Sequence, residues 1–280
     1  MTKSAKVNVP APKGPVAILG GGNMGVSIAR GLVAAGSYSP KDIILTRRQV
    51  QLLEPLAREG FVVRKDNRDA VRKARVVVLA VRPQQLSGLL KEISGAVVPA
   101  RHLVVSIVTG VTVDAILSGL KKPSARVVRA MPNIAVAIRE SMTCVASSRA
   151  PVEALDQARA LFGGLGATLV IDEELIVPAT ALCACGIAFF LRSIRAASQG
   201  GIQIGFHSDD ALVMAAQTAR GAASLLMNAG SHPEGEIDKV TTPSGCTIAG
   251  LNEMEHHGFS SAMITGIVTA AEKAEKLFQK

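Results

Sequence analysis

The sequence is poor in aromatic residues. Tryptophan is absent, tyrosine occurs once, and aromatic residues make up 3% of the 280 residues. Base stacking on aromatic side chains therefore cannot be the main binding device, which argues against a protein that binds single-stranded nucleic acid. Any core must be built from aliphatic residues, as is usual in α/β proteins with parallel strands.

Cysteine and long apolar runs are also scarce. Four cysteines are too few for a secreted domain held together by disulfides, and the N-terminal stretch MTKSAKVNVPAPKG lacks the apolar segment of a signal peptide. The most apolar stretch, residues 176–194, is interrupted by Pro178 and Arg192. We therefore expect a buried helix there, no membrane span, and a cytoplasmic, reducing location.

Charge is distributed unevenly along the chain. The net charge is +9; residues 1–171 carry 24 Lys+Arg against 10 Asp+Glu, a net of +14, whereas residues 172–280 carry 7 against 12, a net of −5. This asymmetry favours an anionic ligand for the first part, either a nucleotide or a nucleic acid. A basic surface that serves only solubility is the alternative.

Short apolar runs alternate with helical patterns up to residue 171, which predicts a doubly wound, mainly parallel sheet of Rossmann type. Ala-rich segments with helical periodicity then follow and predict an all-helical part. We therefore predict two domains, residues 1–171 and residues 172–280. The expected strands are residues 16–19, 43–45, 61–63, 76–81, 103–107, 126–131, 141–146 and 167–171, and the expected later helices are residues 173–201, 208–229 and 260–278.

A glycine-rich turn follows the first strand and precedes a helix. Gly20, Gly22 and Gly25 form the pattern G-x-G-x-x-G in the context that it requires. The first glycine permits a tight turn, the second lets a pyrophosphate approach the backbone, and the third allows close packing of the helix. We therefore predict that a dinucleotide binds at Gly20, Gly21, Gly22, Asn23, Met24 and Gly25.

The end of the second strand indicates which dinucleotide is bound. Proteins that prefer NAD usually place Asp or Glu there, whereas this chain has Thr46-Arg47-Arg48. Two guanidinium groups and a hydroxyl can bind a 2′-phosphate through charge-assisted hydrogen bonds. The sequence thus predicts that NADP(H) is preferred over NAD(H), unless the arginines are merely solvated surface residues.

Further motifs make the chain similar to a known family. The pattern GGGNMG, the segment Ala80-Val81-Arg82-Pro83-Gln84, Met131-Pro132-Asn133, and the segment Thr242–Leu251 resemble pyrroline-5-carboxylate reductases in order and spacing. The resemblance extends from Val16 to Leu277. It implies reduction of 1-pyrroline-5-carboxylate to L-proline by a nicotinamide cofactor, the last step of proline biosynthesis. It also implies a helical domain that binds substrate and forms a homodimer, which often assembles into a larger homo-oligomer.

The resemblance carries site residues with it. Small residues open a helix near Thr247, where free backbone N–H groups and the helix dipole could receive a carboxylate. The resemblance implies that Thr247 helps to protonate the substrate ring nitrogen; the alternative is that Thr242 and Thr247 only cap the helix. Implied substrate contacts are Thr242, Ser244, Gly245, Cys246 and Thr247, and implied cofactor contacts beyond those above are Asn67, Ala80, Val81, Arg82, Pro83 and Asn133.

Several residues depart from the family pattern. Cys183 and Cys185 replace two serines, Ser244 replaces a glycine, and Cys246 directly precedes Thr247. Residues two apart on a helix point to nearly opposite sides, so we do not expect the first two cysteines to hold one metal ion or to form a disulfide with each other. The five histidines lack metal-ligand spacing, and we predict no metal site. The departures leave the substrate range open.

Two other functions remain as alternatives. One is another NADP-dependent imine or β-hydroxyacid reductase of the same two-domain build, although β-hydroxyacid dehydrogenases usually rely on a lysine in the helical domain. Here Lys239 is the only lysine of that part before Lys273. The other is a non-enzymatic nucleotide-binding protein. No recognised nucleic-acid-binding module is present in the sequence, so we predict neither a nucleic-acid partner nor a membrane partner.

Overall fold

A computed structural model describes residues 11–278 and separates into two compact units. One unit contains the described residues up to Ala184 together with those from Ala271 onward, and the other is Cys185–Ala270. The predicted domain limit between residues 171 and 172 lies at the end of the last strand, before the division between the units. The domain limits therefore remain a prediction.

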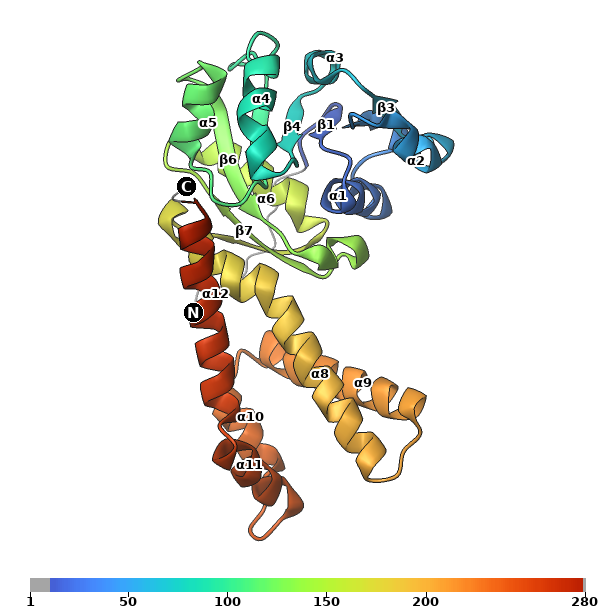
Figure 1. The fold of residues 1–280 in the computed structure, drawn as a ribbon, viewed down its shortest axis with the longest axis vertical. Helices are drawn as coiled ribbons and strands as arrows, with labels where there is room; N and C mark the ends of the chain where they lie inside the picture. Colours follow the sequence, from blue (N-terminus) through green and yellow to red (C-terminus); the bar gives the residue numbers. More distant parts are fainter. Residues whose placement is uncertain (1–10, 279–280) are drawn as a thin grey trace. The chain divides into compact units, whose positions relative to one another are not determined.

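The first unit contains an eight-stranded sheet in the order β3-β2-β1-β4-β5-β6-β7-β8 (Figure 1). All neighbouring strands are parallel except β6 and β7. The expected doubly wound, mainly parallel fold with a helical C-terminal part is confirmed. The strands are β1 (Val16–Leu19), β2 (Ile43–Thr46), β3 (Val62–Arg64), β4 (Val76–Leu79), β5 (Leu103–Ser106), β6 (Arg126–Met131), β7 (Ser141–Ala146) and β8 (Gly166–Val170).

Successive side chains of the central strands point into two separate cores. Val16 and Ile18 of β1 belong to one core, and Ala17 and Leu19 belong to the other. Because both faces are buried, the strand sequences are predominantly apolar. Helices α1 (Asn23–Ala34), α2 (Glu54–Arg58) and α6 (Val152–Gly163) contribute to the first core, and α3 (Asn67–Lys73), α4 (Pro83–Ile93) and α5 (Val113–Leu120) to the second.

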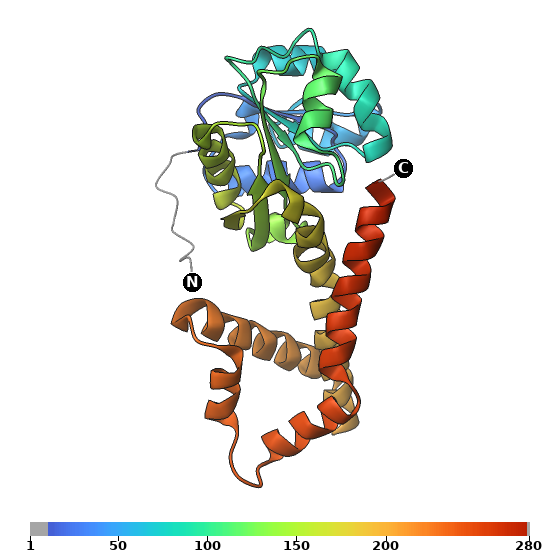
Figure 2. The same ribbon diagram turned by 90° about the vertical axis from the view of Figure 1, so that its left-hand side faces the viewer.

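Short helical turns and then long helices complete the chain. Helices α8 and α9 pack against each other, with α9 running across α8 (Figure 2), and Gly201 permits their approach, since a Cβ there would lie 3.0 Å from the Cβ of Ala211. The 3₁₀ turns are η1 (Pro40–Asp42), η2 (Val50–Leu53), η3 (Ile134–Ile138) and η4 (Glu173–Leu175), and η5 (Thr180–Cys185) is π-helical. The later helices are α7 (Ile176–Ala179), α8 (Gly186–Gln203), α9 (Ser208–Ala229), α10 (Pro233–Val240), α11 (Cys246–His256) and α12 (Phe259–Phe278).

The apolar stretch that ends in α8 is not buried as expected. Only 22% of its most apolar window is buried, and Phe190 and Leu191 are more than half exposed. The expectation of a buried helix is therefore wrong for the single chain, because the residues 11–278 leave much of this apolar surface uncovered. The helical run from Glu173 to Gln203 is long and apolar enough to cross a membrane by length and composition alone, a test that a core helix of a soluble protein also passes. A surface of this kind also suits contact with another subunit.

Candidate cofactor and substrate sites

Two glycines fix the turn between β1 and α1 against its neighbours. Gly20 has φ +120°, and a Cβ there would lie 2.3 Å from the carbonyl oxygen of Ala80. A Cβ at Gly25 would lie 2.2 Å from the carbonyl oxygen of Gly20. The N–H groups of Gly20 and Gly21 both donate to the carbonyl oxygen of Thr46, at 3.2 and 2.7 Å. The turn is thus held by both strands that flank β1.

Gly22 has no such structural need to be glycine. It is the N-cap of α1 in an extended conformation (φ −87°, ψ −173°), it is exposed, and a Cβ there would meet no atom within 4 Å. The helix that it begins has no side-chain cap and no acidic residue in its first turn. Free N–H groups and the positive end of the helix dipole therefore face open space, which is the arrangement that receives a phosphate.

A cavity of about 670 Å³ opens beside this turn. It lies at the carboxyl ends of β1, β2 and β4, where the strand order reverses and where ligands bind in such sheets. Asn23, Met24, Gly25 and Pro83 begin the two adjoining helices and do not line it. The predicted residues that line it are Gly20, Gly21, Gly22, Thr46, Arg47, Arg48, Asn67, Ala80, Val81 and Arg82.

The sequence reasoning missed several lining residues. Lys65 follows β3 as Arg47 follows β2, so its position at the carboxyl end of a strand could have indicated it. The residues on α4 gave no such signal, because which face of a helix meets a cavity depends on tertiary packing. The lining residues not predicted are Gln49, Lys65, Gln85, Gly88, Leu89 and Glu92.

Three basic side chains gather near the end of β2. Nη1 of Arg47 donates to the carbonyl oxygen of Gly21 at 2.9 Å, so this arginine supports the glycine turn. Arg48 and Lys65 are exposed, and within residues 11–278 neither has a hydrogen bond or an ion pair to a side chain. Their cationic groups are therefore available to an anionic ligand.

A chain of hydrogen bonds connects three lining residues. The hydroxyl of Thr46 donates to Oδ1 of Asn67 at 2.6 Å, and Nδ2 of Asn67 donates to both carboxylate oxygens of Glu92, at 3.1 and 3.0 Å. Both ends of the Asn67 amide are thus occupied. The second lone pair of Oδ1 and the second N–H of Nδ2 can still bind a ligand in the cavity that Asn67 lines, and the predicted contact of Asn67 with a cofactor remains a prediction.

Asn133 lies outside the cavity lining and is 5% exposed. Its Oδ1 accepts from the N–H of Ala135 at 3.0 Å, and its Nδ2 donates to the carbonyl oxygen of Cys183 at 3.2 Å. The side chain therefore connects the segment after β6 with the π-helical turn η5. The predicted contact of Asn133 with the nicotinamide remains a prediction.

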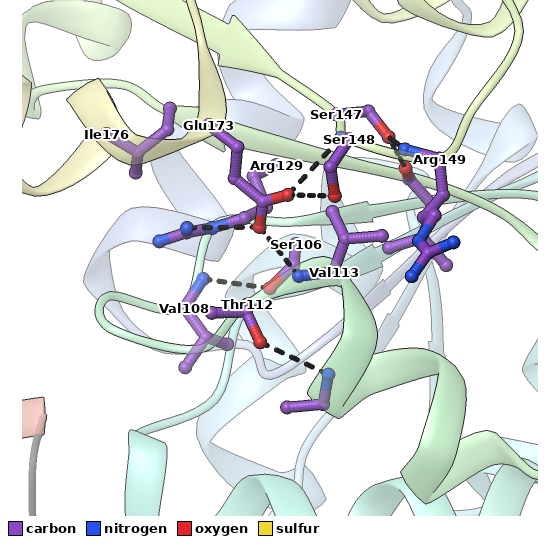
Figure 3. Close-up of polar contacts among 12 residues, drawn as sticks. Ser106, Val108, Thr112, Val113, Arg129, Ser147, Ser148, Arg149, Glu173 and Ile176 are labelled. Carbon is purple, nitrogen blue, oxygen red and sulfur yellow. Dashed lines mark hydrogen bonds and ion pairs between the residues drawn. The ribbon is translucent and has the colours of Figure 1, made fainter.

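A buried ion pair lies near the ends of β5 and β6 (Figure 3). Arg129, 4% exposed, donates to Oε1 of Glu173 at 3.3 Å, and this carboxylate also accepts from the N–H of Val113 at 2.7 Å and of Ser148 at 3.2 Å. Burial lowers the pKa of Arg129, and the Glu173 carboxylate opposes that shift. Glu173 thereby joins the chain after β8 to β6, α5 and the segment after β7. An arginine within an apolar strand was the signal that sequence reasoning overlooked.

The predicted substrate residues lie together at the start of α11. Gly245 is the N-cap, and its N–H donates to the carbonyl oxygen of Thr242 at 3.0 Å. A Cβ at Gly245 would lie 2.5 Å from Oγ1 of Thr242, and Ser244 has φ +58°, a conformation that favours glycine. Ser244 is therefore one of the few residues other than glycine that adopt this conformation within residues 11–278.

The start of α11 is open to an anion. Cys246 is exposed and Thr247 half-buried. The helix has no acidic residue in its first turn, and no side chain caps its N-terminus. The alternative that Thr242 and Thr247 only cap this helix is therefore wrong. The first-turn N–H groups can therefore receive a carboxylate beside the Thr247 hydroxyl. This segment belongs to the second compact unit and the cavity to the first.

Comparison with family models divides the chain in a similar way. A model described as "Pyrroline-5-carboxylate reductase dimerisation" matches residues 173–277. A model described as "NADP oxidoreductase coenzyme F420-dependent" matches residues 15–110.

Proteins similar over nearly the whole chain carry the same name. Pyrroline-5-carboxylate reductase 1 of Dictyostelium discoideum is 52% identical over 275 residues, which cover 94% of this chain and 50% of that protein. Pyrroline-5-carboxylate reductase 2 of the same organism is 47% identical over 276 residues and is covered to 92%. The chain thus spans half the length of the first relative and nearly all of the second. A solved pyrroline-5-carboxylate reductase from Coxiella burnetii has 27% identity and a TM-score of 0.86, over 95% of this chain and 99% of that one.

Proposed function

Because this chain belongs to the pyrroline-5-carboxylate reductase family, we propose that it reduces the C=N bond of 1-pyrroline-5-carboxylate to give L-proline, with NADPH as the hydride donor. The observation that carries the proposal is the 47% identity to a relative that the chain covers almost end to end. The chain is an oxidoreductase acting on C=N bonds. Its family membership decides against the β-hydroxyacid dehydrogenase and the non-enzymatic alternatives.

The cavity at the carboxyl ends of β1, β2 and β4 fits a dinucleotide. The open position at Gly22 and the uncapped start of α1 would hold the pyrophosphate through backbone N–H groups. Arg48 and Lys65 would bind the 2′-phosphate, which favours NADP(H) over NAD(H), while Arg47 keeps the turn in place. When bound, NADPH supplies the hydride that reduces the C=N carbon.

The start of α11 offers a binding site for the substrate carboxylate and a proton donor for the ring nitrogen. Its first-turn N–H groups would bind the substrate carboxylate, which orients the ring, and the Thr247 hydroxyl would donate a proton to the ring nitrogen as that atom gains electron density. Thr242, Ser244 and Gly245 shape the turn that presents these donors. Cys246 is exposed beside them and would contact substrate from the same turn.

The chain forms a homo-oligomer, and we infer that the unit of assembly is a homodimer made through the helical domain. The match to a dimerisation family over residues 173–277 supports this, as does the exposed apolar surface of α8 and α9, which includes Phe190 and Met214. Assembly into a larger homo-oligomer, a cytoplasmic location, the domain limits at residues 171 and 172, and the absence of nucleic-acid and membrane partners remain predictions.

The test is a spectrophotometric assay of NADPH and NADH oxidation with 1-pyrroline-5-carboxylate. We expect turnover with a lower KM for NADPH. Thr247→Val, which removes the hydroxyl at nearly constant volume, should lower kcat by roughly 10²-fold or more, whereas the control Thr247→Ser should keep most of it. Fluorescence titration should show unchanged NADPH binding in both variants. Absence of turnover by the wild type with either cofactor would overturn the function, and full kcat in Thr247→Val would overturn the role of Thr247 alone.

A further inference from the structure

Two cysteines far apart in the sequence meet in the first compact unit. The sulfur atoms of Cys144 and Cys183 lie 4.0 Å apart and form a sulfur–sulfur hydrogen bond, although the two residues are 39 positions apart in the sequence. Cys144 lies on β7 and is 3% exposed, whereas Cys183 lies on the π-helical turn η5 and is half-buried. Neither belongs to the cofactor cavity or to the start of α11.

Two contacts with residues 131 and 133 hold the cysteines near each other. Cys144 pairs with Met131 in the antiparallel register of β6 and β7. Asn133, two residues after Met131, donates from its Nδ2 to the carbonyl oxygen of Cys183 at 3.2 Å. The end of β6 and the residues directly after it therefore position both cysteines. Apolar side chains, including Ile176 and Ala146, surround the pair.

The two thiols are not equivalent. The hydrogen bond from Cys144 stabilises the Cys183 thiolate and lowers the pKa of Cys183, whereas the pKa of Cys144 is raised by the same hydrogen bond and by burial. The half-buried Cys183 thiol, with its lowered pKa, therefore reacts first with an oxidant, and the buried Cys144 thiol in contact with it is placed to react second.

We propose that Cys144 and Cys183 form a dithiol site that hydrogen peroxide, or a similar small peroxide, oxidises to an intramolecular disulfide joining β7 to η5. This proposal stands apart from the reductase function proposed above. The Cys183 thiolate attacks one peroxide oxygen, the O–O bond breaks, hydroxide leaves, and Cys183 becomes a sulfenic acid. The sulfur of Cys144 then attacks the sulfur of Cys183; the S–S bond forms, the S–O bond breaks, and the proton of the Cys144 thiol leaves with the hydroxyl as water. Two thiols thereby lose two electrons to one peroxide, which yields two waters.

The distance between the sulfur atoms sets the movement that the bond requires. A disulfide needs a sulfur–sulfur distance of about 2.05 Å, so the two sulfur atoms must approach by about 2 Å. Cys185 provides a matched control, because it lies on the same π-helical turn, is also half-buried, and has no sulfur partner within residues 11–278. Cys246 is exposed and reports whether the oxidant reached the protein.

The experiment treats the full chain with a small molar excess of hydrogen peroxide. Remaining thiols are then alkylated with N-ethylmaleimide under denaturing conditions, and tryptic peptides are mapped by mass spectrometry without reduction. We expect residues 140–149, which contain Cys144, to be linked to residues 160–192, which contain Cys183 and Cys185. The link should be found in the wild type and in Cys185→Ser, should be absent in Cys183→Ser, and should disappear on treatment with dithiothreitol. The linked pair should account for two of the four thiols, and any oxidation of Cys246 is counted separately on its own peptide.

Peptide mapping of the wild type decides the proposal even if a variant fails to fold. Complete alkylation of Cys144 in a sample whose Cys246 has been oxidised would overturn it. A link that persists in Cys183→Ser, or that is lost in a correctly folded Cys185→Ser, would overturn it as well, because Cys185 would then be the reacting partner.

Discussion

Gly22→Ala separates a glycine needed by a ligand from a glycine needed by the fold. The backbone of Gly22 is extended, and a Cβ there would meet no atom within 4 Å, so alanine fits the free protein. If a pyrophosphate lies over the start of α1, the added methyl group occupies the space that the phosphate oxygens need. We therefore expect Gly22→Ala to keep the fold and to lose cofactor affinity.

The structure sets the size of both effects. A glycine-to-alanine change at a compatible conformation stabilises a protein by about 0.4–1 kcal/mol, so the melting temperature should stay the same or rise slightly. A hydrogen bond to a charged group contributes about 1.5–3 kcal/mol, so the loss of one or two phosphate contacts should cost about 3 kcal/mol. At 1.4 kcal/mol for each factor of ten, the Kd for NADPH should rise roughly 100-fold.

Binding is measured by NADPH fluorescence titration and stability by thermal unfolding without cofactor. Gly163→Ala is the matched control, because Gly163 is exposed at the end of α6, lies outside the cavity lining, and also has no atom within 4 Å of an added Cβ. Gly20→Ala should instead lower the melting temperature, since its φ is +120° and its Cβ would meet the carbonyl of Ala80. If Gly22→Ala binds NADPH within threefold of the wild type, the assignment of this turn to the pyrophosphate is refuted.

Two further substitutions test the cationic side chains of the first unit. Arg48→Ala should raise the KM for NADPH by roughly tenfold or more and leave that for NADH unchanged, because it removes only a 2′-phosphate contact; Arg47→Ala should raise both, since this arginine supports the turn at Gly21. Equal effects of Arg48→Ala on the two cofactors would contradict the assignment. Glu173→Ala should lower the free energy of unfolding by about 3 kcal/mol, because it leaves Arg129 buried without its partner. An unchanged urea midpoint would show that the ion pair contributes nothing to stability.

The sheet could be predicted because its strands, which are buried on both faces, are predominantly apolar. Residues 126–131 and 141–146 form strands with the predicted limits. The fourth strand ends at Leu79, before the predicted limit at Val81, because Ala80 and Val81 turn into the edge of the cavity. The antiparallel direction of β7 could not be predicted, since a buried strand has the same apolar sequence in either direction.

The cofactor cavity was predictable where it follows strand ends and unpredictable where helices line it. Glycines and cations directly after apolar runs indicate a ligand at the carboxyl ends of parallel strands. The residues predicted in that way are Gly20, Gly21, Gly22, Thr46, Arg47 and Arg48. Glu92 belongs to an ordinary amphipathic helix, and nothing in its neighbourhood indicates that its carboxylate accepts from Asn67. The hydrogen bonds of the Asn67 amide to Thr46 and Glu92 follow only from the structure.

Cys183 shows most clearly why spacing cannot reveal a partner. Residues two apart on a helix point away from each other, and that argument dismisses a bond between Cys183 and Cys185 without indicating any other. The partner, Cys144, comes from a strand that precedes α6 and β8, and it meets Cys183 because β7 pairs with β6 and Asn133 bonds to the carbonyl of Cys183. Cys183 and Cys185 share the same local sequence and a similar exposure, so the different reactivity that we propose for them is a property of the tertiary fold. Peptide mapping that distinguishes these two neighbours therefore tests the fold around η5 as directly as it tests the chemistry.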